Sequence, residues 1–272
     1  NSRRDHGGVI FIDLRDDAGL LQIVIQPENV ANFSEAEHLR DEYAIAVTGL
    51  IRERGEGLEN PNITTGKIEL VAESFTILNA SKPLPISLNE ANKSSEELRL
   101  KYRYLDLRRA KMQETLKRRA KYLSFIRRFM EDQEFLEVQT PILANSSPEG
   151  ARDFLVPSRI HAGKFYALPQ APQQFKQLLM VGGVDKYYQI APCFRDEDPR
   201  ADRLYGDFYQ LDVERAFVED GEEIRREMEV LIQNLVKDFA GKDLVSAEIP
   251  RIAYEDAMNI YGSDKPDLRF GM

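Results

Sequence analysis

The sequence predicts an α+β protein of two domains, a small N-terminal β-barrel followed by a larger domain built on an antiparallel sheet. Short runs of alternating apolar residues before residue 80 predict several strands and one helix. Beyond residue 110, strands and helices follow one another without the regular βαβ alternation of parallel sheets. With 272 residues, 42% of them hydrophobic, the chain can form one large or two ordinary domains.

The N-terminal domain is expected to contain strands over 9–16, 20–26, 43–53 and 67–77, with a helix near 33–41. A short turn at Asp17-Ala18-Gly19 joins the first two strands as a β-hairpin. Turn-forming residues fill the loop at 55–62. This content is typical of an OB-fold, a barrel of about five strands. Because the chain opens abruptly, we expect the first strand to be only partly present.

A linker is predicted between the two domains. Residues 79–97 contain prolines and serines and show little hydrophobic periodicity. We therefore expect an OB-fold domain over 1–80, a linker or hinge over 81–111 and a second domain over 112–272.

The second domain is expected to begin with a long amphipathic helix over 112–133. Its apolar residues recur in steps of three or four: Leu116, Ala120, Leu123, Ile126 and Met130. A strand that ends at Pro141 follows. Further strands are expected around 165–168, 186–194 and 207–217, with helices over 173–182 and from Ile224 to Phe239. The start of the last helix, Asp220-x-x-Glu223, resembles a capping box.

Composition argues against several classes of protein. The single cysteine, Cys193, rules out an intrachain disulfide and fits a reducing cytosol. No apolar run approaches the roughly 20 residues of a membrane span, and no signal-peptide pattern opens the chain. His6, His38 and His161 lack the spacing of zinc ligands. We expect a cytoplasmic protein without a metal site in this chain.

The charge distribution leaves two interpretations open. The net charge is −9, yet residues 99–121 are strongly basic. A basic stretch of this kind is typical either of a nucleic-acid contact or of a solvated helix face.

The most informative segment is the charged hairpin at 189–217. An apolar strand ends in Phe194-Arg195-Asp196-Glu197, a loop with Arg200 and Arg203 follows, and an alternating strand returns. A guanidinium forks onto phosphate oxygens, and a nearby carboxylate accepts from an amino group. The hairpin therefore suits a planar, phosphate-bearing ligand. A surface hairpin held by salt bridges is the alternative.

The hairpin, with FRDED-x-RADR in its sequence, resembles motif 2 of class II aminoacyl-tRNA synthetases, in the form found in bacterial aspartyl-tRNA synthetases. The helix 112–133 and the strand after it resemble motif 1, and RYLDLRR at 103–109 resembles the segment before the catalytic domain. SPEGARDFLVPSR at 147–159 and FYALPQAPQQFKQLLM at 165–180 disfavour the lysyl and asparaginyl branches. The resemblance covers essentially the whole chain.

The resemblance implies an aspartate–tRNA ligase with no protein nucleophile. The α-carboxylate of L-aspartate attacks the α-phosphate of ATP, and the aspartyl group then passes to the 3′ end of tRNA. The family also implies Mg²⁺ on the phosphates and a homodimer formed through residues 112–141. No membrane partner is implied.

The resemblance also assigns the aspartate pocket. Arg195 matches the catalytic arginine that grips the α-phosphate and the attacking carboxylate. Lys176 matches the lysine that pairs with the side-chain carboxylate of the substrate. Glu149 and Asp212 match the acids that hold the α-ammonium group, and Gln173 matches a polar contact to the amino acid. A solvent-facing lysine and an outward-facing strand acid are the alternatives for Lys176 and Asp212.

The ATP site is assigned in the same way. Arg195, Asp196 and Glu197 match its polar residues, and Phe208 matches the aromatic ring on which adenine stacks. A core phenylalanine is the alternative for Phe208.

In the barrel, Phe11, Gln22 and Glu69 match the positions that read the anticodon. Family members that accept both tRNA(Asp) and tRNA(Asn) tend to carry a histidine in the first hairpin and a glycine in a later loop. His6 and Gly57 occupy about these positions, so we expect a non-discriminating enzyme. An enzyme specific for tRNA(Asp) is the alternative.

The chain departs from the family pattern at three places. Ala171 replaces a serine before Pro172. Residues 204–207 replace a shorter Gln-Pro-Glu stretch, so the ATP-contacting glutamine expected after Arg203 is absent from this chain. Motif 3, with its magnesium carboxylates, is missing from these 272 residues. A non-catalytic tRNA-binding paralogue without motif 3 is therefore a further alternative.

Overall fold

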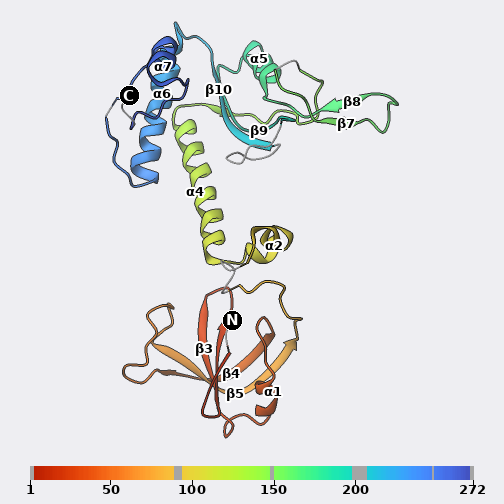
Figure 1. The fold of residues 1–272 in the computed structure, drawn as a ribbon, viewed down its shortest axis with the longest axis vertical. Coiled ribbons are helices and arrows are strands. Elements are labelled where there is room, and N and C mark those ends of the chain that lie inside the picture. Colours follow the sequence, from red (N-terminus) through yellow and green to blue (C-terminus); the bar gives the residue numbers. More distant parts are fainter. Residues whose placement is uncertain (1–2, 89–93, 148–149, 198–206, 247, 270–272) are drawn as a thin grey trace. The chain divides into compact units, whose positions relative to one another are not determined.

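A computed structural model describes residues 3–88, 94–147, 150–197, 207–246 and 248–269 (Figure 1). The chain divides into two compact units, Asn1–Met112 and Gln113–Met272. In the described part of the chain, no helix combines the length and the apolar character that crossing a membrane requires.

The first unit is a five-stranded sheet with the order β1-β2-β3-β5-β4. Its elements are β1 (Arg3–His6), β2 (Val9–Arg15), β3 (Leu20–Ile25), α1 (Phe33–Glu37), β4 (Ala44–Glu53) and β5 (Ile68–Asn79). Strands β3 and β5 pair in parallel and the other neighbours pair antiparallel. The four predicted strands are confirmed, the helix is shorter than expected, and β1 supplies a fifth strand.

The barrel core is formed by alternate residues of β2 and β3, because successive side chains of a strand point to opposite faces. Ile10, Ile23 and Ile25 are fully buried. The pairing of β4 with β5 shifts register between Thr48 and Gly49, as at a β-bulge. A Cβ atom at Gly49 would lie 2.0 Å from the carbonyl oxygen of Val71, so only glycine fits there.

Two short helices, α2 (Glu96–Lys101) and α3 (Arg103–Asp106), lie within the expected linker. The carboxylate of Asp106 is fully buried and pairs with Arg103 at 2.5 Å and Arg109 at 2.6 Å. Arg108 pairs with Glu42. Part of the basic stretch is therefore neutralised within the protein, which leaves less of it for nucleic acid.

The second unit contains a mixed three-stranded sheet with the order β10-β9-β6. The helix α4 (Ala110–Asp132) leads to β6 (Leu136–Glu137), which pairs in parallel with β9 (Lys186–Phe194). Strand β10 (Asp207–Arg215) pairs antiparallel with β9, as the hairpin prediction required. The strand predicted to end at Pro141 has only two residues.

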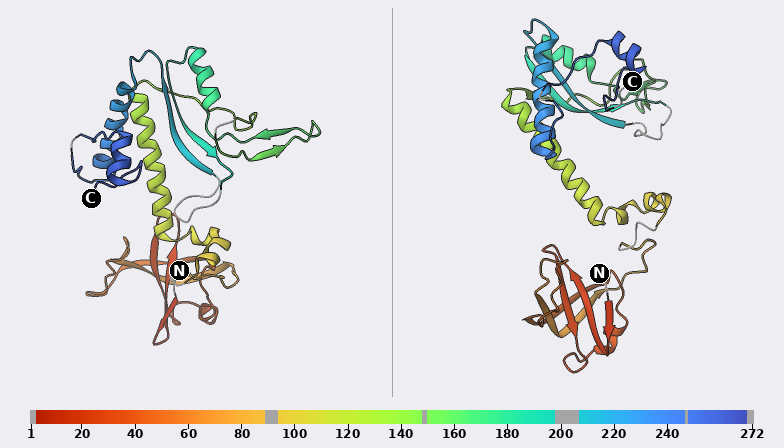
Figure 2. Two further views of the ribbon diagram at one scale, coloured as in Figure 1. Left: turned by 45° about the horizontal axis from the view of Figure 1, so that its top comes forward. Right: turned by 60° about the vertical axis from the view of Figure 1, so that its left-hand side comes forward.

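Helices α4 and α6 (Gly221–Asn234) cover one face of this sheet (Figure 2). The apolar cluster between them contains Ile126, Met130, Phe135, Tyr188 and Leu231. The last helix was predicted to reach Phe239. Its α-helical part, α6, ends at Asn234, and a π-helical turn, η2 (Leu235–Phe239), follows directly. The opposite face of β9 and β10 carries polar side chains.

The start of α6 differs slightly from the predicted capping box. The Asp220 side chain accepts from the N–H of Glu222 at 2.9 Å, and Glu223 accepts from the N–H of Glu219 at 3.3 Å. A capping box would pair Asp220 with the N–H of Glu223, and Glu223 with the N–H of Asp220. Each carboxylate instead accepts from the N–H one residue earlier in the chain.

The remaining elements are two short strands and two helices (Figure 1). Strands β7 (Leu155–Pro157) and β8 (Phe165–Ala167) form a small ladder, and α5 (Gln173–Val181) packs against β9 and β10. Helix α7 (Tyr254–Tyr261) follows α6 along the chain. Strand β7 and helix α7 were not predicted, because three residues of strand and eight of helix give no clear periodicity.

Candidate active site and nucleic-acid interface

The face of the β9–β10 hairpin that lies opposite α4 and α6 carries polar side chains and is called the polar face below. The register places Gln189 opposite Asp212 and Tyr187 opposite Glu214, so all four side chains share one face. Leu211 and Val213, which alternate with the two acids, pack against the apolar cluster instead. The alternation predicted for β10 is therefore confirmed, with its acids on one side.

Lys176 reaches this surface from α5 and is held by two carboxylates. Its Nζ lies 3.0 Å from Oδ1 and 3.2 Å from Oδ2 of Asp212, and 2.9 Å from Oε1 of Glu214. Burial acts to lower the pKa of Lys176, but hydrogen bonds to Glu214 and Asp212 outweigh it and raise the pKa above its ordinary value. The lysine is therefore a firmly charged ammonium and not a solvent-facing one.

Gln189, on the same face as Asp212, is buried and accepts hydrogen bonds from two side chains. Its Oε1 accepts from the hydroxyl of Tyr187 at 2.8 Å and from the hydroxyl of Thr140 at 3.0 Å. Burial raises the pKa of Tyr187, and the charges of Asp212 and Glu214 raise it further. The tyrosine hydroxyl consequently remains protonated and serves as a donor.

Arg195 and Phe208 meet at the end of the hairpin. The guanidinium carbon of Arg195 lies 4.9 Å from the centroid of the Phe208 ring, in a cation–π arrangement. The N–H of Asp196 donates to the carbonyl of Arg152 at 2.9 Å, and Nε of Arg152 donates to the carbonyl of Asp196 at 3.1 Å. This reciprocal pair fixes the backbone next to Arg195.

The other residues predicted for the pocket are either exposed or outside the described residues. Gln173 is the first residue of α5, one turn before Lys176, and its side chain is exposed. Glu197 is exposed beyond the end of β9. Glu149, Arg200 and Arg203 lie outside the described residues.

Gln170, which sequence reasoning missed, ties the segment after residue 150 to the start of α5. The side chain is 2% exposed. It accepts from the N–H of Ala151 at 3.2 Å and donates to the carbonyl of Ala151 at 2.9 Å and to Asp153 at 2.5 Å. Burial acts to raise the pKa of Asp153, but hydrogen bonds from Ser146 and Gln170 lower it overall.

Gln170→Ala is expected to lower the free energy of unfolding by about 1–3 kcal/mol, because it leaves both backbone groups of Ala151 without their partner. Urea unfolding followed by circular dichroism measures this loss. Gln177→Ala on the exposed side of α5 is the control and should change stability little. Equal stability of the two variants would contradict the buried role of Gln170.

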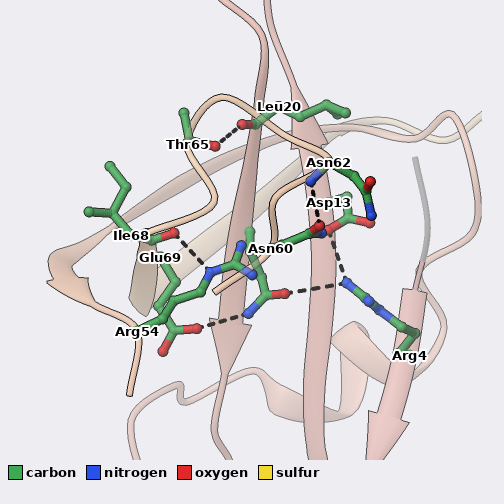
Figure 3. Close-up of polar contacts among 10 residues, drawn as sticks. Arg4, Asp13, Leu20, Arg54, Asn60, Asn62, Thr65, Ile68 and Glu69 are labelled. Atoms are coloured by element: carbon green, nitrogen blue, oxygen red, sulfur yellow. Dashed lines mark hydrogen bonds and ion pairs between the residues drawn. The ribbon is translucent and has the colours of Figure 1, made fainter. Parts of the chain in front are cut away.

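The outer face of the barrel carries a chain of polar contacts. Nε2 of Gln22 donates to Glu69 at 2.8 Å, and Nε of Arg52 donates to the other oxygen of Glu69 at 2.8 Å. Arg4 donates to Gln22 at 3.3 Å and to Asp13 at 3.0 Å (Figure 3). The structure therefore brings together Gln22 and Glu69, which were predicted from positions 47 residues apart.

Phe11 belongs to the same face. Arg4 pairs with Phe11 across β1 and β2, and the His6 ring lies edge-on to the Phe11 ring with centroids 6.0 Å apart. Gly57 lies in the loop between β4 and β5 with φ of 78°, in the left-handed region that favours glycine. An aromatic ring beside amide and carboxylate groups suits the stacking and hydrogen bonding of unpaired bases.

Comparison with known families identifies the family of the chain. A model described as tRNA synthetases class II (D, K and N) matches residues 95–272, and an OB-fold nucleic acid binding domain matches residues 1–78. The chain belongs to the class II tRNA synthetases of the D, K and N group. The predicted fold, an OB-fold barrel followed by a class II synthetase domain, is confirmed.

Similar curated proteins carry the name aspartate–tRNA(Asp/Asn) ligase. Those of Chlorobium chlorochromatii (strain CaD3) and Chlorobium phaeobacteroides (strain BS1) are 55% and 54% identical over 98% of this chain. That of Bartonella bacilliformis is 54% identical over the same share. The chain spans 44% of the length of each of these relatives.

Solved synthetase structures show the same fold. Asparaginyl-tRNA synthetase from Pyrococcus horikoshii, complexed with asparaginyl-adenylate, superposes with a TM-score of 0.78 at 24% identity, over 95% of this chain and 61% of that one. A putative aspartyl-tRNA synthetase from Leishmania major Friedlin gives 0.74 at 23% identity, over 88% of this chain and 48% of that one.

Several polar residues at the polar face were not singled out from the sequence as site residues. Glu214 was visible in the alternation of β10, two residues after Asp212. Tyr187, Gln189 and Thr140 gave no such signal, and the contact between Thr140 and Gln189 joins residues 49 positions apart. Among the residues that the structure describes, no group of three or more His, Cys, Asp and Glu side chains is placed to hold a metal.

Proposed function

We propose that this chain is the anticodon-binding domain and part of the catalytic domain of an aspartate–tRNA(Asp/Asn) ligase. The complete protein activates L-aspartate with ATP to aspartyl-adenylate and transfers the aspartyl group to the 3′ end of tRNA. The observation that carries the proposal is the charged Lys176 on the polar face of the hairpin that also bears Arg195. A fixed cation there recognises a substrate carboxylate.

In the proposed aspartate pocket, each charged group has one role. Lys176 binds the side-chain carboxylate, which separates aspartate from neutral asparagine. Asp212 and Glu149 receive the α-ammonium group, and Gln173 contacts the amino acid. Arg195 holds the attacking carboxylate against the α-phosphate and neutralises the charge that develops there.

The ATP site rests on Arg195 and Phe208. A guanidinium over an aromatic ring offers a phosphate ligand and a stacking surface side by side, which fits a nucleotide. Asp196 and Glu197 complete the predicted polar contacts. Mg²⁺ supplies charge neutralisation on the phosphates, and its carboxylate ligands are expected outside these residues.

We also propose a cytoplasmic homodimer formed through residues 112–141. Apolar side chains are exposed at the end of this segment and just beyond it: Leu136 at 56%, Ile142 at 48% and Leu143 at 53%. A second copy that covers them would remove apolar surface from water. Sedimentation of the complete protein measures its oligomeric state.

The primary test is ATP–pyrophosphate exchange by the complete protein with aspartate, asparagine or lysine. Exchange that depends on aspartate alone supports the proposal. Exchange with asparagine or lysine instead would reject it. Binding of tRNA without any exchange would favour the non-catalytic paralogue.

Residues of the OB-fold barrel influence which tRNA the enzyme aminoacylates. The anticodons for aspartate and asparagine differ only at the third letter, and we propose that His6 and Gly57 permit both. Position 57 is surrounded by open space, since no atom of the described residues outside its chain neighbours comes within 4 Å of the point where a Cβ atom would lie. His6 packs against Phe11, one of the proposed anticodon-binding residues.

We therefore expect the complete protein to aminoacylate tRNA(Asp) and tRNA(Asn) transcripts with similar kcat/KM. His6→Leu should raise the preference for tRNA(Asp) without changing aspartate activation, and His38→Leu in the same domain is the control. A wild-type preference for tRNA(Asp) of about a hundredfold or more, near 2.7 kcal/mol, would reject this idea.

A further inference from the structure

Arg195 lies just beyond the end of its strand. Strand β9 ends at Phe194, whose partner across the hairpin is Asp207, and Arg195 is the next residue. A group that acts on a reacting phosphate must be held to within about 0.5 Å of its productive position, and strand pairing holds a side chain best inside the strand. Contacts from outside the hairpin are therefore needed to fix the backbone at Arg195.

Two segments from outside the hairpin hold the backbone on either side of Arg195. The N–H of Phe194 donates to the carbonyl of Pro169 at 2.9 Å. The N–H of Asp196 donates to the carbonyl of Arg152 at 2.9 Å, and Nε of Arg152 donates to the carbonyl of Asp196 at 3.1 Å. The residues before and after Arg195 are thus both held, and Arg152 makes two of these three bonds.

Gln170 joins the two holding segments to each other. It directly follows Pro169 in the chain, and its side chain bonds both backbone groups of Ala151, at 3.2 Å to the N–H and 2.9 Å to the carbonyl. Ala151 directly precedes Arg152. The contacts therefore close a ring around the backbone of Arg195, and no member of the ring can shift without straining its hydrogen bonds.

The side chain of Arg152 stands out within this ring. It is exposed, whereas that of Gln170 is buried. An exposed arginine commonly pairs with a carboxylate, but the partner of Arg152 in the described part of the chain is the backbone carbonyl of Asp196. A guanidinium directed at that carbonyl acts on the position of the backbone beside Arg195 and contributes little to the core.

We propose that Arg152 is a positioning residue for Arg195. It holds the backbone of Asp196 so that the Arg195 guanidinium, which lies over Phe208, stays directed at the α-phosphate. The inference rests on the proposed function of Arg195 and adds a residue outside the aspartate and ATP sites. Since Arg152 acts only through Arg195, its loss lowers the rate of adenylate formation and leaves the binding of both substrates nearly unchanged.

Single-turnover formation of aspartyl-adenylate by the complete protein tests this with Arg152→Met, which keeps the side-chain stem and removes its N–H donors. We expect the rate constant to fall by about tenfold or more. The KM values for ATP and L-aspartate should stay within about twofold of wild type. Arg159→Met is the matched control, because Arg159 is also exposed but lies after β7 at the far end of its segment.

A double variant separates positioning from direct contact. In the Arg195→Ala protein, adding Arg152→Met should lower the remaining rate by less than about twofold, because a residue that acts through Arg195 has nothing left to position. Effects that multiply in the double variant, or a raised KM for ATP in Arg152→Met, would make Arg152 an independent ligand contact and overturn the inference.

Hydrogen exchange measures the backbone position without depending on catalysis. In Arg152→Met, the amide of Asp196 loses the bond that reinforces its own, so peptides that cover 194–197 should exchange faster than in wild type and in Arg159→Met. Unchanged exchange, or a wild-type rate of adenylate formation in a variant that circular dichroism shows to be folded, overturns the inference.

The proposed function has its own readout in aspartate-dependent pyrophosphate exchange by the wild-type protein. Pyrophosphate exchange by the wild type without the effects of Arg152→Met rejects the inference alone. Absence of pyrophosphate exchange rejects the proposed function, and the hydrogen-exchange comparison then still decides whether Arg152 holds the backbone beside Arg195.

Discussion

Lys176→Met is expected to weaken the use of L-aspartate by about 2–5 kcal/mol, while the KM for ATP changes little. Methionine keeps most of the side-chain volume but removes the ammonium, so Asp212 and Glu214 repel the substrate carboxylate. Pyrophosphate exchange by the complete protein, measured over a range of aspartate concentrations, gives this loss as a change in kcat/KM.

The matched control for this substitution is Lys186→Met. Lys186 lies on β9, but its Nζ contacts the carbonyl of Gln133 and the carboxylate of Glu134, away from the polar face. Its replacement should leave the KM for aspartate near the wild-type value. A wild-type KM for aspartate in Lys176→Met would contradict the role given to this lysine.

Arg195→Ala is expected to lower kcat for aspartate activation by roughly a thousandfold or more, the scale on which an arginine at a transferring phosphoryl group acts. Single-turnover formation of aspartyl-adenylate measures the chemical step directly. Arg159→Ala, at an exposed position after β7, is the control and should retain wild-type activity.

Arg195→Lys separates charge from geometry. Lysine keeps the positive charge but has neither the planar fork that grips phosphate oxygens nor the flat surface that lies over Phe208. We therefore expect it to recover little of the lost rate. Full activity in Arg195→Lys would show that a point charge suffices at this position.

Much of the fold was predictable because the pattern of apolar residues follows the period of each element. The hairpin of β9 and β10 is the clearest case, since an apolar run predicts β9 and the alternation of residues in β10 predicts its two faces. The long helix α4 was similarly evident from steps of three and four.

The contacts around Gln170 and Gln189 could not be predicted in this way. Each is a buried amide whose partners come from segments distant in sequence, such as Thr140 for Gln189 and Ala151 for Gln170. A single glutamine in a polar stretch has no periodicity. Its importance arises only when burial forces its hydrogen bonds to be satisfied within the protein.

The adjacent tyrosines of β9 show how little freedom the hairpin has to change length. Tyr188 packs into the apolar cluster under the helices, whereas Tyr187 faces the cluster of charges. Deleting one residue within β10 would turn Asp212 and Glu214 toward the helices and the apolar residues between them toward the polar face. Insertions and deletions in related chains should therefore accumulate between the two strands and not within them, since a change of length there leaves the two faces as they are.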